Sequence, residues 1–512
     1  MVNKVTTATV IGLNAYEVSV ETDVQNGLPS FSVVGLPDTA ITEARDRVRS
    51  AVKNSGFSFP KTKIIINLAP ADLKKVGTSF DLPMAVGLLI EEEVLEEVKI
   101  KDYAFVGELS LNGDLRCVRG VLPIVIGLKE IGVKNVIVPM PNVKEAALID
   151  GINVFGADCL ADVVNHFVET PLKQFKIDIN AYLADLNEHF EYDFKDVKGQ
   201  QKAKRALEIA AAGGHNLLMI GSPGSGKTLM AKCFASILPP LELSEALELT
   251  KIYSICGLLS GDKPLMSKRP FRTVHHTASP NGIIGGGSNP MPGEITLAHR
   301  GVLFLDEMVE FPRNVLEVLR QPIEDGEIVI SRAKHSIKYP ANFMLLGAMN
   351  PCPCGYLGDK EKQCTCSEFM VNRYLAKLSG PLLDRIDLQI DVPRLSAKEL
   401  LNIEESTETS AQIRERVIKA RKIQANRYKN ENILTNSELT SELVKKYCQI
   451  DEASKEIFKT AIVKYQLSGR RYDRTLKLAR TIADLDGAEI IGQKHLMQAL
   501  QYKMFDKDEL NI

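Results

Sequence analysis

The stretch LLMIGSPGSGKTLMAKCFA, residues 217–235, decides the fold of this chain. Its first four residues are apolar and predict a buried strand, and the residues from Lys227 onward predict a helix. The loop between them fits the pattern G-x-x-x-x-G-K-[ST], with Gly221, Ser222, Pro223, Gly224, Ser225, Gly226, Lys227 and Thr228. We therefore expect the backbone N–H groups of this loop to wrap phosphates, Lys227 to neutralise their charge and Thr228 to bind Mg²⁺.

Two further apolar strands end in polar residues that suit the same chemistry. GVLFLDEM (301–308) places Asp306 and Glu307 directly after a strand, and FMLLGAMN (343–350) ends in Asn350. Solvated surface acids are the alternative for the two carboxylates, but they fit poorly after so apolar a run. We expect Asp306 to hold the water shell of Mg²⁺, Glu307 to polarise the attacking water and Asn350 to orient that water. The order of the three motifs predicts an AAA+ motor that uses ATP and Mg²⁺, as distinct from a small GTPase.

The length and composition predict several domains. The chain has 512 residues, 45% of them hydrophobic and 25% charged, with a formal net charge of −2, which is typical of a soluble protein of about three domains. The patterns predict an α+β domain over 1–172, a linker over 173–195, an α/β P-loop core over 196–394 and a helical lid over 395–512. Apolar runs are too short to span a bilayer and no signal peptide is evident, so we expect a cytoplasmic protein without membrane contact.

Four longer segments resemble one family. They read VKGQQKAKRALEIAAAGGHNLLMIGSPGSGKT, HHTASPNGIIGGGSNPMPGEITLAHRGVLFLDE, NPCPCGYLGD and SGPLLDRIDL, and together they closely resemble the magnesium-chelatase-like AAA+ ATPases of the ComM/YifB type. The resemblance implies that Arg385, in LLDRID, is an arginine finger for a neighbouring subunit. It also implies that Arg470 is the sensor-2 arginine of the lid, with Arg471 and Arg474 as close competitors. A surface ion pair is the alternative for each of these arginines.

The N-terminal region looks like the proteolytic domain of Lon, in the segment VGELSLNGDLRCVRGVLPIVIGLKEIGVKNVIVP (106–139). A Lon-type protease needs a Ser that a Lys activates. Ser79 lies where that Ser would be, and Lys129 in GLKE looks like the Lys motif. However, counting back from IGVKNVIVP places the Lon lysine near Leu122 and leaves Lys129 close to the end of its helix. We therefore expect a Lon-like fold without the catalytic dyad.

Four of the nine cysteines form two C-x-C pairs just after Asn350, and they are Cys352, Cys354, Cys364 and Cys366. Cysteine clusters in a reducing compartment favour a metal over disulfides. Four thiolates would hold Zn²⁺ in a structural site, because no ligand position stays open for catalysis. The C-x-C spacing is tighter than the usual C-x₂₋₄-C, and free thiols or a redox pair remain alternatives.

The segment EDGEIVISRAKHSIKYPANF (324–343) predicts two strands joined near Ala333, with four basic residues at or close to the tip: Arg332, Lys334, His335 and Lys338. DNA-translocating relatives such as the MCM helicases carry a pore hairpin at this place. The resemblance therefore favours contacts with the phosphates of branched or single-stranded DNA, independent of sequence. A solvated turn is the alternative. We expect the basic stretch 414–430 to be a solvated helix face and His275 and His276 to belong to a structural loop.

Three hypotheses follow for the function. The first is a ring of subunits, which the family resemblance implies is a hexamer, that couples ATP hydrolysis to DNA translocation or branch migration. A ring follows if Arg385 completes a neighbour's site, because head-to-tail interfaces close. The second is a protein-remodelling ATPase that resembles the magnesium-chelatase motor subunit. The third is a Lon-like peptidase built on Ser79.

Overall fold

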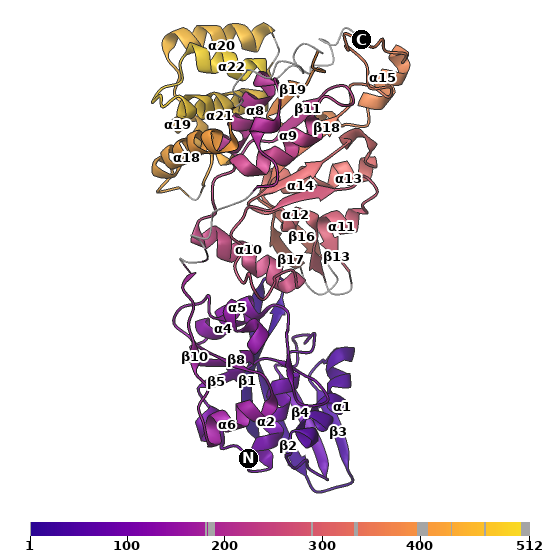
Figure 1. Cartoon of the computed structure of the whole chain (residues 1–512), viewed down its shortest axis with the longest axis vertical. Coiled ribbons are helices and arrows are strands. Elements are labelled where there is room, and N and C mark those ends of the chain that lie inside the picture. Colours follow the sequence, from indigo (N-terminus) through magenta and orange to yellow (C-terminus); the bar gives the residue numbers. More distant parts are fainter. Residues whose placement is uncertain are drawn as a thin grey trace. The chain divides into compact units, whose positions relative to one another are not determined.

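The computed structural model of the chain describes residues 2–179, 182, 190–287, 290–331, 336–396, 408–431, 433–464 and 467–502. The chain forms two compact units, labelled by element in Figure 1. The first unit comprises residues 1–187 together with 242–267, and the second comprises residues 188–241 together with 268–512. The segment 242–267 thus interrupts the second unit in sequence and folds with the first.

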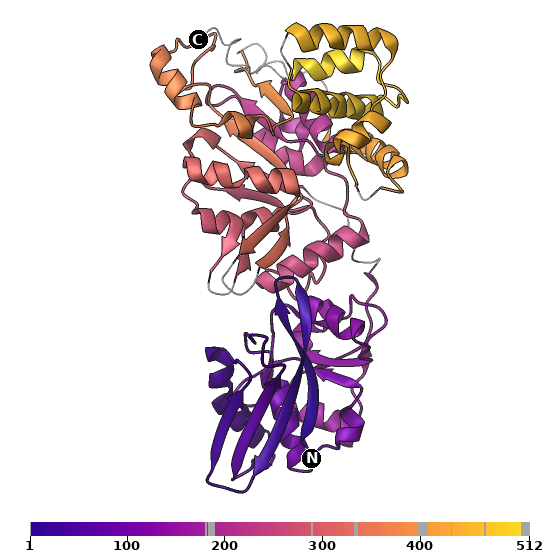
Figure 2. The same ribbon diagram turned by 180° about the vertical axis from the view of Figure 1, so that it is seen from behind.

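The first unit is built on a mixed sheet of eight strands in the order β10-β9-β8-β5-β1-β2-β4-β3. Its longer half consists of β1 (Asn3–Ile11), β2 (Asn14–Gln25), β4 (Lys63–Ala69) and β3 (Ser30–Val34), which lie side by side in the reverse view of Figure 2. Its other half consists of β5 (Tyr103–Phe105), β8 (Asn135–Pro139), β9 (Asn153–Ala157) and β10 (Gln174–Phe175). Two short strands, β6 (Glu108–Leu109) and β7 (Leu115–Arg116), form a separate ladder.

Nearly all helices of the first unit pack against this sheet, whereas α10 packs against α4. The helices are α1 (Thr39–Asn54), α2 (Asp81–Glu91), α3 (Glu97–Ile100), α4 (Val121–Glu130), η1 (Met140–Asn142), α5 (Val143–Ala146), α6 (Leu160–Val168) and α10 (Leu243–Cys256). Helix α10 comes from the 242–267 segment, and its Ser254 contacts the buried carboxylate of Glu145 in α5. That contact ties the segment to the first unit.

The core of the second unit is a parallel sheet of five strands in the order β12-β15-β18-β11-β19. These strands are β11 (Leu217–Ile220), β12 (Phe271–Val274), β15 (Val302–Leu305), β18 (Met344–Met349) and β19 (Leu388–Asp391). Every residue of β11, β15 and β18 is buried, as expected for a parallel sheet covered on both faces. Since all strands run in the same direction, their carboxyl ends meet at one edge of the sheet.

Further elements precede or connect the strands of the second unit. They are η2 (Phe194–Asp196), α8 (Gln201–Gly213), α9 (Lys227–Phe234), η3 (Ala235–Ile237), α11 (Pro280–Ile284), β13 (Gly285–Gly286), β14 (Met291–Pro292), α12 (Glu294–Leu297), η4 (Met308–Glu310), α13 (Arg313–Val318), α14 (Arg320–Asp325), α15 (Glu368–Leu375) and α16 (Gly380–Leu383). The predicted hairpin before β18 is confirmed in its strands: β16 (Glu327–Ser331) pairs antiparallel with β17 (Ser336–Pro340).

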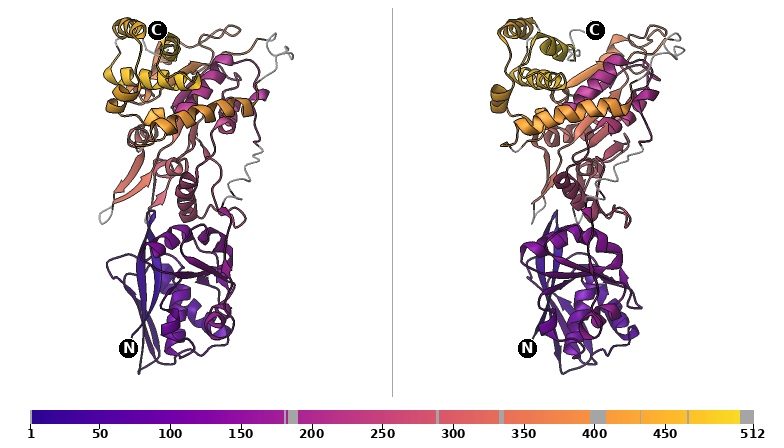
Figure 3. Two further views of the ribbon diagram at one scale, coloured as in Figure 1. Left: turned by 90° about the vertical axis from the view of Figure 1, so that its left-hand side faces the viewer. Right: turned by 60° about the vertical axis from the view of Figure 1, so that its left-hand side comes forward.

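From residue 408 onward the described chain is helical. The elements are α18 (Ser410–Arg427), η5 (Asn436–Glu438), α19 (Ser441–Tyr447), α20 (Glu452–Lys464), α21 (Gly469–Leu485) and α22 (Gln493–Gln501), coloured orange to yellow in the two views of Figure 3. Their apolar residues join the core formed by α8, α9 and the sheet. The predicted fold class, an α+β N-terminal domain, an α/β AAA+ core and a helical C-terminal region, is confirmed.

The expectation of a solvated face for 414–430 is wrong for several of its arginines. Arg416 forms ion pairs with Glu208 and Glu408, Arg421 donates to the carbonyl of Ala211 (2.9 Å), and Arg427 donates to the fully buried Asp484 (2.9 Å). A guanidinium can bury its stem and still satisfy its donors. These side chains therefore fasten α18 to α8 and α21. Within the described residues, no helix is long and apolar enough to cross a membrane.

Candidate nucleotide-binding site

The P-loop lies between β11 and α9, as the sequence predicts. Gly224 and Gly226 have φ values of +78° and +92°, a left-handed conformation that glycine adopts without strain. The Lys227 side chain is only 8% exposed and its Nζ donates to the carbonyls of Gly221 (2.7 Å) and Ser222 (3.0 Å). Burial lowers the pKa of Lys227, while Asp306 and Glu307 act in the opposite direction. The lysine therefore sits within the loop whose backbone would wrap a phosphate.

The residues after β15 contact the P-loop directly. Thr228 donates its hydroxyl to Oδ2 of Asp306 at 2.8 Å, and the amide of Glu307 donates to Oδ1 of Asp306 at 3.0 Å. Glu307 itself has a φ of +51°, which is uncommon for a residue other than glycine and is often found at functional sites. Thr228 and Asp306 thus offer two neighbouring oxygen ligands that suit Mg²⁺ and its water shell.

Asn350 follows β18, the strand that lies between β11 and β15. Its Oδ1 lies 3.4 Å from Nζ of Lys227. The structure therefore brings together the P-loop, the two carboxylates and the amide at the carboxyl edge of the sheet. These positions match the arrangement that the sequence predicts, and their catalytic roles remain predictions.

The predicted finger and sensor arginines form a second cluster around Glu324. Arg385 is 9% exposed, forms an ion pair with Glu324 and donates to the carbonyl of Pro381 (2.7 Å). Arg470 is exposed and also lies 3.6 Å from Glu324. One carboxylate therefore attracts both arginines. Among the described residues, neither arginine forms a hydrogen bond or an ion pair with the P-loop.

The two competing lid arginines contact the segment after α16. Arg471 lies 3.3 Å from Asp384, and Arg474 donates to the carbonyl of Asp384 and lies 3.8 Å from Asp387. Burial would raise the pKa of Asp387, but the hydrogen bond from His215 and the charge of Arg474 hold it well below its usual range. This geometry matches the ion-pair alternative for Arg474.

The hairpin tip falls largely outside the described residues, because Arg332, Lys334 and His335 belong to the segment 332–335. Lys338 is described and lies on β17, where its Nζ forms an exposed ion pair with Glu327 at 2.9 Å. A DNA phosphate would have to displace Glu327 from this lysine.

In the N-terminal unit, Lys129 lies one residue before the end of α4, as the register argument predicts. Position 122 is a buried leucine in the first turn of the same helix, and its amide donates to Glu145 (2.9 Å). Ser79 precedes α2, and its carbonyl accepts from the amide of Gly107 (3.0 Å). The structure places no lysine at the helix position that the Lon resemblance requires.

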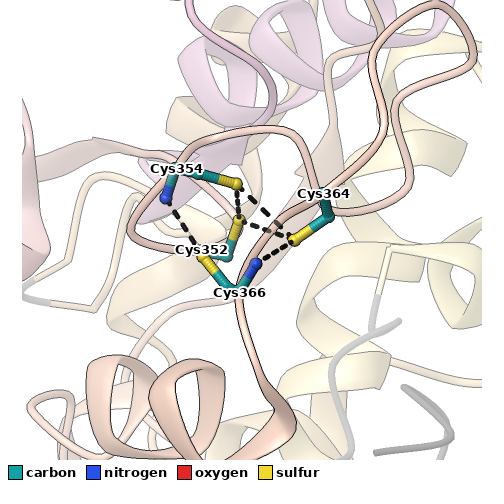
Figure 4. Close-up of side chains that lie close together, drawn as sticks. All are labelled: Cys352, Cys354, Cys364 and Cys366. Atoms are coloured by element: carbon teal, nitrogen blue, oxygen red, sulfur yellow. Dashed lines mark hydrogen bonds between the residues drawn. The ribbon is translucent and has the colours of Figure 1, made fainter.

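The four cysteine sulfurs converge in one place (Figure 4). The Sγ atoms of Cys352, Cys354 and Cys364 lie 3.4, 3.5 and 3.7 Å apart, and all four ligand atoms lie within 4.8 Å of one another. A tetrahedral Zn²⁺ with Zn–S bonds of about 2.3 Å requires sulfurs about 3.8 Å apart. Burial alone would raise the pKa of Cys354, but the backbone N–H groups of Tyr356 and Thr365 lower it to about 6. The pKa of each of the other three thiols is raised instead, so the fit to a metal is judged from the spacing of the sulfurs. The donor set therefore fits zinc.

Two residues at the site were not predicted. Gln200, which precedes α8 in a left-handed conformation, donates to the carbonyl of Pro393 (2.7 Å) and lies 3.5 Å from that of Ser225 in the P-loop. The second is Asp359, in the cysteine segment. The pKa of its carboxyl is lowered to about 2, mainly by the hydroxyl of Ser222 and then by the backbone N–H groups of Glu361 and Lys362. Sequence gave little signal for either residue, because each acts through a contact made by the folded loops.

Known proteins are similar to this chain over nearly its full length. Family models described as magnesium chelatase subunit ChlI, subunit ChlI of Mg-chelatase, and the ChlI C-terminal region match residues 193–400, 20–142 and 407–503. The uncharacterized protein YifB of Salmonella typhimurium is 43% identical over 98% of this chain and 97% of its own length. Competence protein ComM of Haemophilus influenzae is 43% identical over 96% of both chains.

A more distant relative is a magnesium-chelatase subunit ChlI homolog of Methanocaldococcus jannaschii, 25% identical over 62% of this chain and 88% of its own length. Together with the geometry of the P-loop, these similarities support an AAA+ ATPase that uses ATP and Mg²⁺. The identity with YifB and ComM over nearly the full length shows that the chain belongs to the ComM/YifB-type family of magnesium-chelatase-like AAA+ proteins.

Proposed function

We propose that this chain is a ring-forming AAA+ ATPase that couples ATP hydrolysis to DNA translocation or branch migration. The observation that supports the ATPase most directly is the meeting of three strand ends: Thr228 contacts Asp306 at 2.8 Å, and Lys227 lies 3.4 Å from Asn350. A phosphate-wrapping loop beside two carboxylates and an amide is the arrangement that phosphoryl transfer to water needs.

Each residue has a distinct role in this proposal. The backbone N–H groups of the loop 221–228, apart from Pro223, which has none, wrap the phosphates, and Lys227 neutralises their charge. The oxygens of Thr228 and Asp306 hold Mg²⁺, which supplies Lewis-acid stabilisation of the transferring group. Glu307 accepts a proton from the attacking water, and Asn350 orients that water.

Arg385 and Arg470 are the two arginines that we assign to the assembled ring. Proteins of this family typically oligomerise, and we propose a hexamer in which Arg385 stabilises the charge that develops in a neighbour's site. Arg470 would act as sensor 2 of the lid. Both arginines contact Glu324, so entry of Arg385 into a neighbour's site requires exchange of this ion pair.

The DNA part of the proposal rests on the β16–β17 hairpin, which enters β18 at the end opposite Asn350. Its basic residues would grip phosphates without reading sequence. The alternative is a remodelling ATPase that grips a partner protein, which the match to three ChlI family models favours. DNA-stimulated hydrolysis distinguishes the two.

The proposal also includes three finer assignments. The first is the division into 1–172, a linker over 173–195, a core over 196–394 and a lid over 395–512, except that the segment 242–267 within the core folds with the first unit. The second assigns one structural Zn²⁺ per chain to Cys352, Cys354, Cys364 and Cys366, whose sulfurs suit tetrahedral binding. The third places the protein in the cytoplasm, where such thiolates stay reduced.

The decisive experiment measures ATPase activity of the purified chain with and without branched DNA over a range of salt concentrations. We expect DNA to stimulate hydrolysis and the stimulation to fall as salt rises, because phosphate contacts release counterions. ATPase activity that branched and single-stranded DNA leave unchanged would favour the protein-remodelling alternative. Absence of hydrolysis in wild type under all conditions would contradict both.

A further inference from the structure

We propose that the cysteine loop, residues 351–366, is a zinc-held brace that keeps the P-loop in its nucleotide-binding conformation. The inference rests on the proposed nucleotide site and deepens it, because it assigns the metal centre a role in binding affinity. It concerns the four cysteines and the two loop residues that contact the P-loop, Gly355 and Asp359.

The first observation is that the cysteine loop is closed on itself by its sulfurs. The amide of Cys354 donates to Sγ of Cys366 and the amide of Cys366 donates to Sγ of Cys364, both at 3.4 Å. Amide donors to sulfur stabilise thiolates that bind a metal. A zinc ion bound by both C-x-C pairs would therefore hold the two ends of the loop together.

The second observation is a backbone contact with the P-loop. Gly355 has a φ of +85°, and its amide donates to the carbonyl of Cys352 at 2.9 Å. A Cβ atom on Gly355 would lie 2.6 Å from Cδ and 2.7 Å from Cγ of Pro223. Only a residue without a side chain fits here, so the turn from Cys352 to Gly355, which contains the first two cysteines, packs directly on the P-loop.

The third observation is the position of Asp359. Its Oδ1 accepts from the amides of Glu361 (2.8 Å) and Lys362 (3.0 Å), which fixes the carboxylate in the loop. The hydroxyl of the P-loop residue Ser222, itself 6% exposed, is the main cause that lowers the pKa of this carboxyl. Oδ2 is buried without a hydrogen bond of standard length among the described residues. Asp359 thus presents a buried acceptor beside a P-loop hydroxyl.

The fourth observation is that the other side of the loop is also anchored near the site. Glu361 lies 3.8 Å from Arg394, and the adjacent carbonyl of Pro393 accepts from Gln200, which lies 3.5 Å from the carbonyl of Ser225. The cysteine loop also begins directly after Asn350. Four separate points therefore connect it to the walls of the nucleotide site.

A physical consequence follows for binding. When the metal is removed, four thiols replace a rigid centre and the loop gains conformational freedom that it must lose again to contact Pro223 and Ser222. The P-loop then spends less time in the binding conformation, and the apparent dissociation constant rises by the inverse of the competent fraction. If that fraction falls to about one fifth, affinity for nucleotide falls about fivefold.

The test uses the full chain and needs no DNA and no turnover. Zinc content is measured by elemental analysis, and affinity for a fluorescent ATP analogue is measured with Mg²⁺ present. We expect one zinc per chain in wild type. The double variant Cys364→Ser/Cys366→Ser should lose the zinc and bind the analogue at least fivefold more weakly. The matched control is Cys117→Ser/Cys159→Ser, in the other unit, which should keep zinc and affinity.

A second variant keeps the experiment informative if the double variant does not fold. Asp359→Ala retains every sulfur ligand, so it should keep its zinc but bind the analogue several-fold more weakly, whereas Lys360→Ala, at the exposed neighbouring residue, should match wild type. Full affinity in Asp359→Ala and in zinc-free protein would overturn the brace. Wild type without zinc would overturn the metal centre, and wild type that binds no nucleotide would instead overturn the proposed function.

Discussion

Replacement of Glu307 by Gln should stop ATP hydrolysis while leaving nucleotide binding intact. Glu307 follows β15, and its amide donates to Asp306 at 3.0 Å. Gln has the same length and shape as Glu, so this backbone contact and the pairing of Asp306 with Thr228 are retained. What is lost is the carboxylate that accepts a proton from the attacking water.

The size of the effect follows from that single loss. A positioned general base contributes about 10²- to 10⁴-fold in rate, or about 2.7–5.4 kcal/mol of barrier at 1.36 kcal/mol for each tenfold change. The free energy of unfolding should stay unchanged, because the left-handed conformation of residue 307 (φ +51°) is as unfavourable for Gln as for Glu and the side chain is exposed. We therefore expect kcat to fall by at least a hundredfold with an unchanged melting temperature.

Steady-state hydrolysis and equilibrium binding of a fluorescent ATP analogue measure the two effects separately. Glu310→Gln is the matched control, because this exposed glutamate lies three residues further on and pairs with Lys377 at 3.4 Å. It should hydrolyse ATP at close to the wild-type rate. Turnover by Glu307→Gln within a few-fold of wild type would refute the assignment of the catalytic base.

Three other outcomes are expected. Arg385→Ala should bind nucleotide but hydrolyse it poorly, and mixing it with Lys227→Ala protein should restore some activity; no recovery at any ratio would contradict a finger shared between subunits. A hairpin variant with Arg332→Ala, Lys334→Ala and Lys338→Ala should bind DNA of any sequence more weakly and retain basal ATPase activity. The slope of its DNA affinity against salt concentration should fall by up to about three counterions; an unchanged slope would contradict DNA binding by the hairpin. Asp484→Ala should lower the free energy of unfolding of the second unit by about 3–5 kcal/mol in chemical denaturation, because Arg480 and Arg427 lose their buried partner; a loss below 1 kcal/mol would show that water replaces the carboxylate.

The nucleotide site could be predicted from sequence because its signals are local. An apolar run that ends in Gly221, in Asp306 or in Asn350 identifies a buried parallel strand and its carboxyl end, and parallel strands bring those ends to one edge. No long-range information was needed beyond that rule. The four cysteines were predicted for a similar reason, since two C-x-C pairs within 15 residues can meet without help from the rest of the fold.

The arginine contacts could not be predicted in the same way. Arg385 and Glu324 are 61 residues apart in sequence, and no periodicity connects them. The basic helix α18 was misjudged because a pattern of charges gives no information on whether a guanidinium faces water or a buried carbonyl such as that of Ala211. The contact between Gly355 and Pro223 was equally invisible, because it depends on how two loops pack after both strands are in place.

Strand β18 explains why the hairpin and the cysteine loop should be separable in experiment. Strand β17 of the hairpin ends at Pro340, and three residues separate it from the start of β18 at Met344, whereas Asn350 and the cysteine loop follow Met349 at the other end. All six residues of the strand are buried between β11 and β15, so it forms a fixed connection through the sheet. Loss of the basic residues therefore removes contacts at the amino end and should leave nucleotide affinity unchanged. Loss of the metal acts at the carboxyl end, beside Lys227, and should weaken nucleotide binding even when DNA is absent. A hairpin variant that lost affinity for nucleotide in the absence of DNA would contradict this separation, because the two ends of the strand would then not act independently.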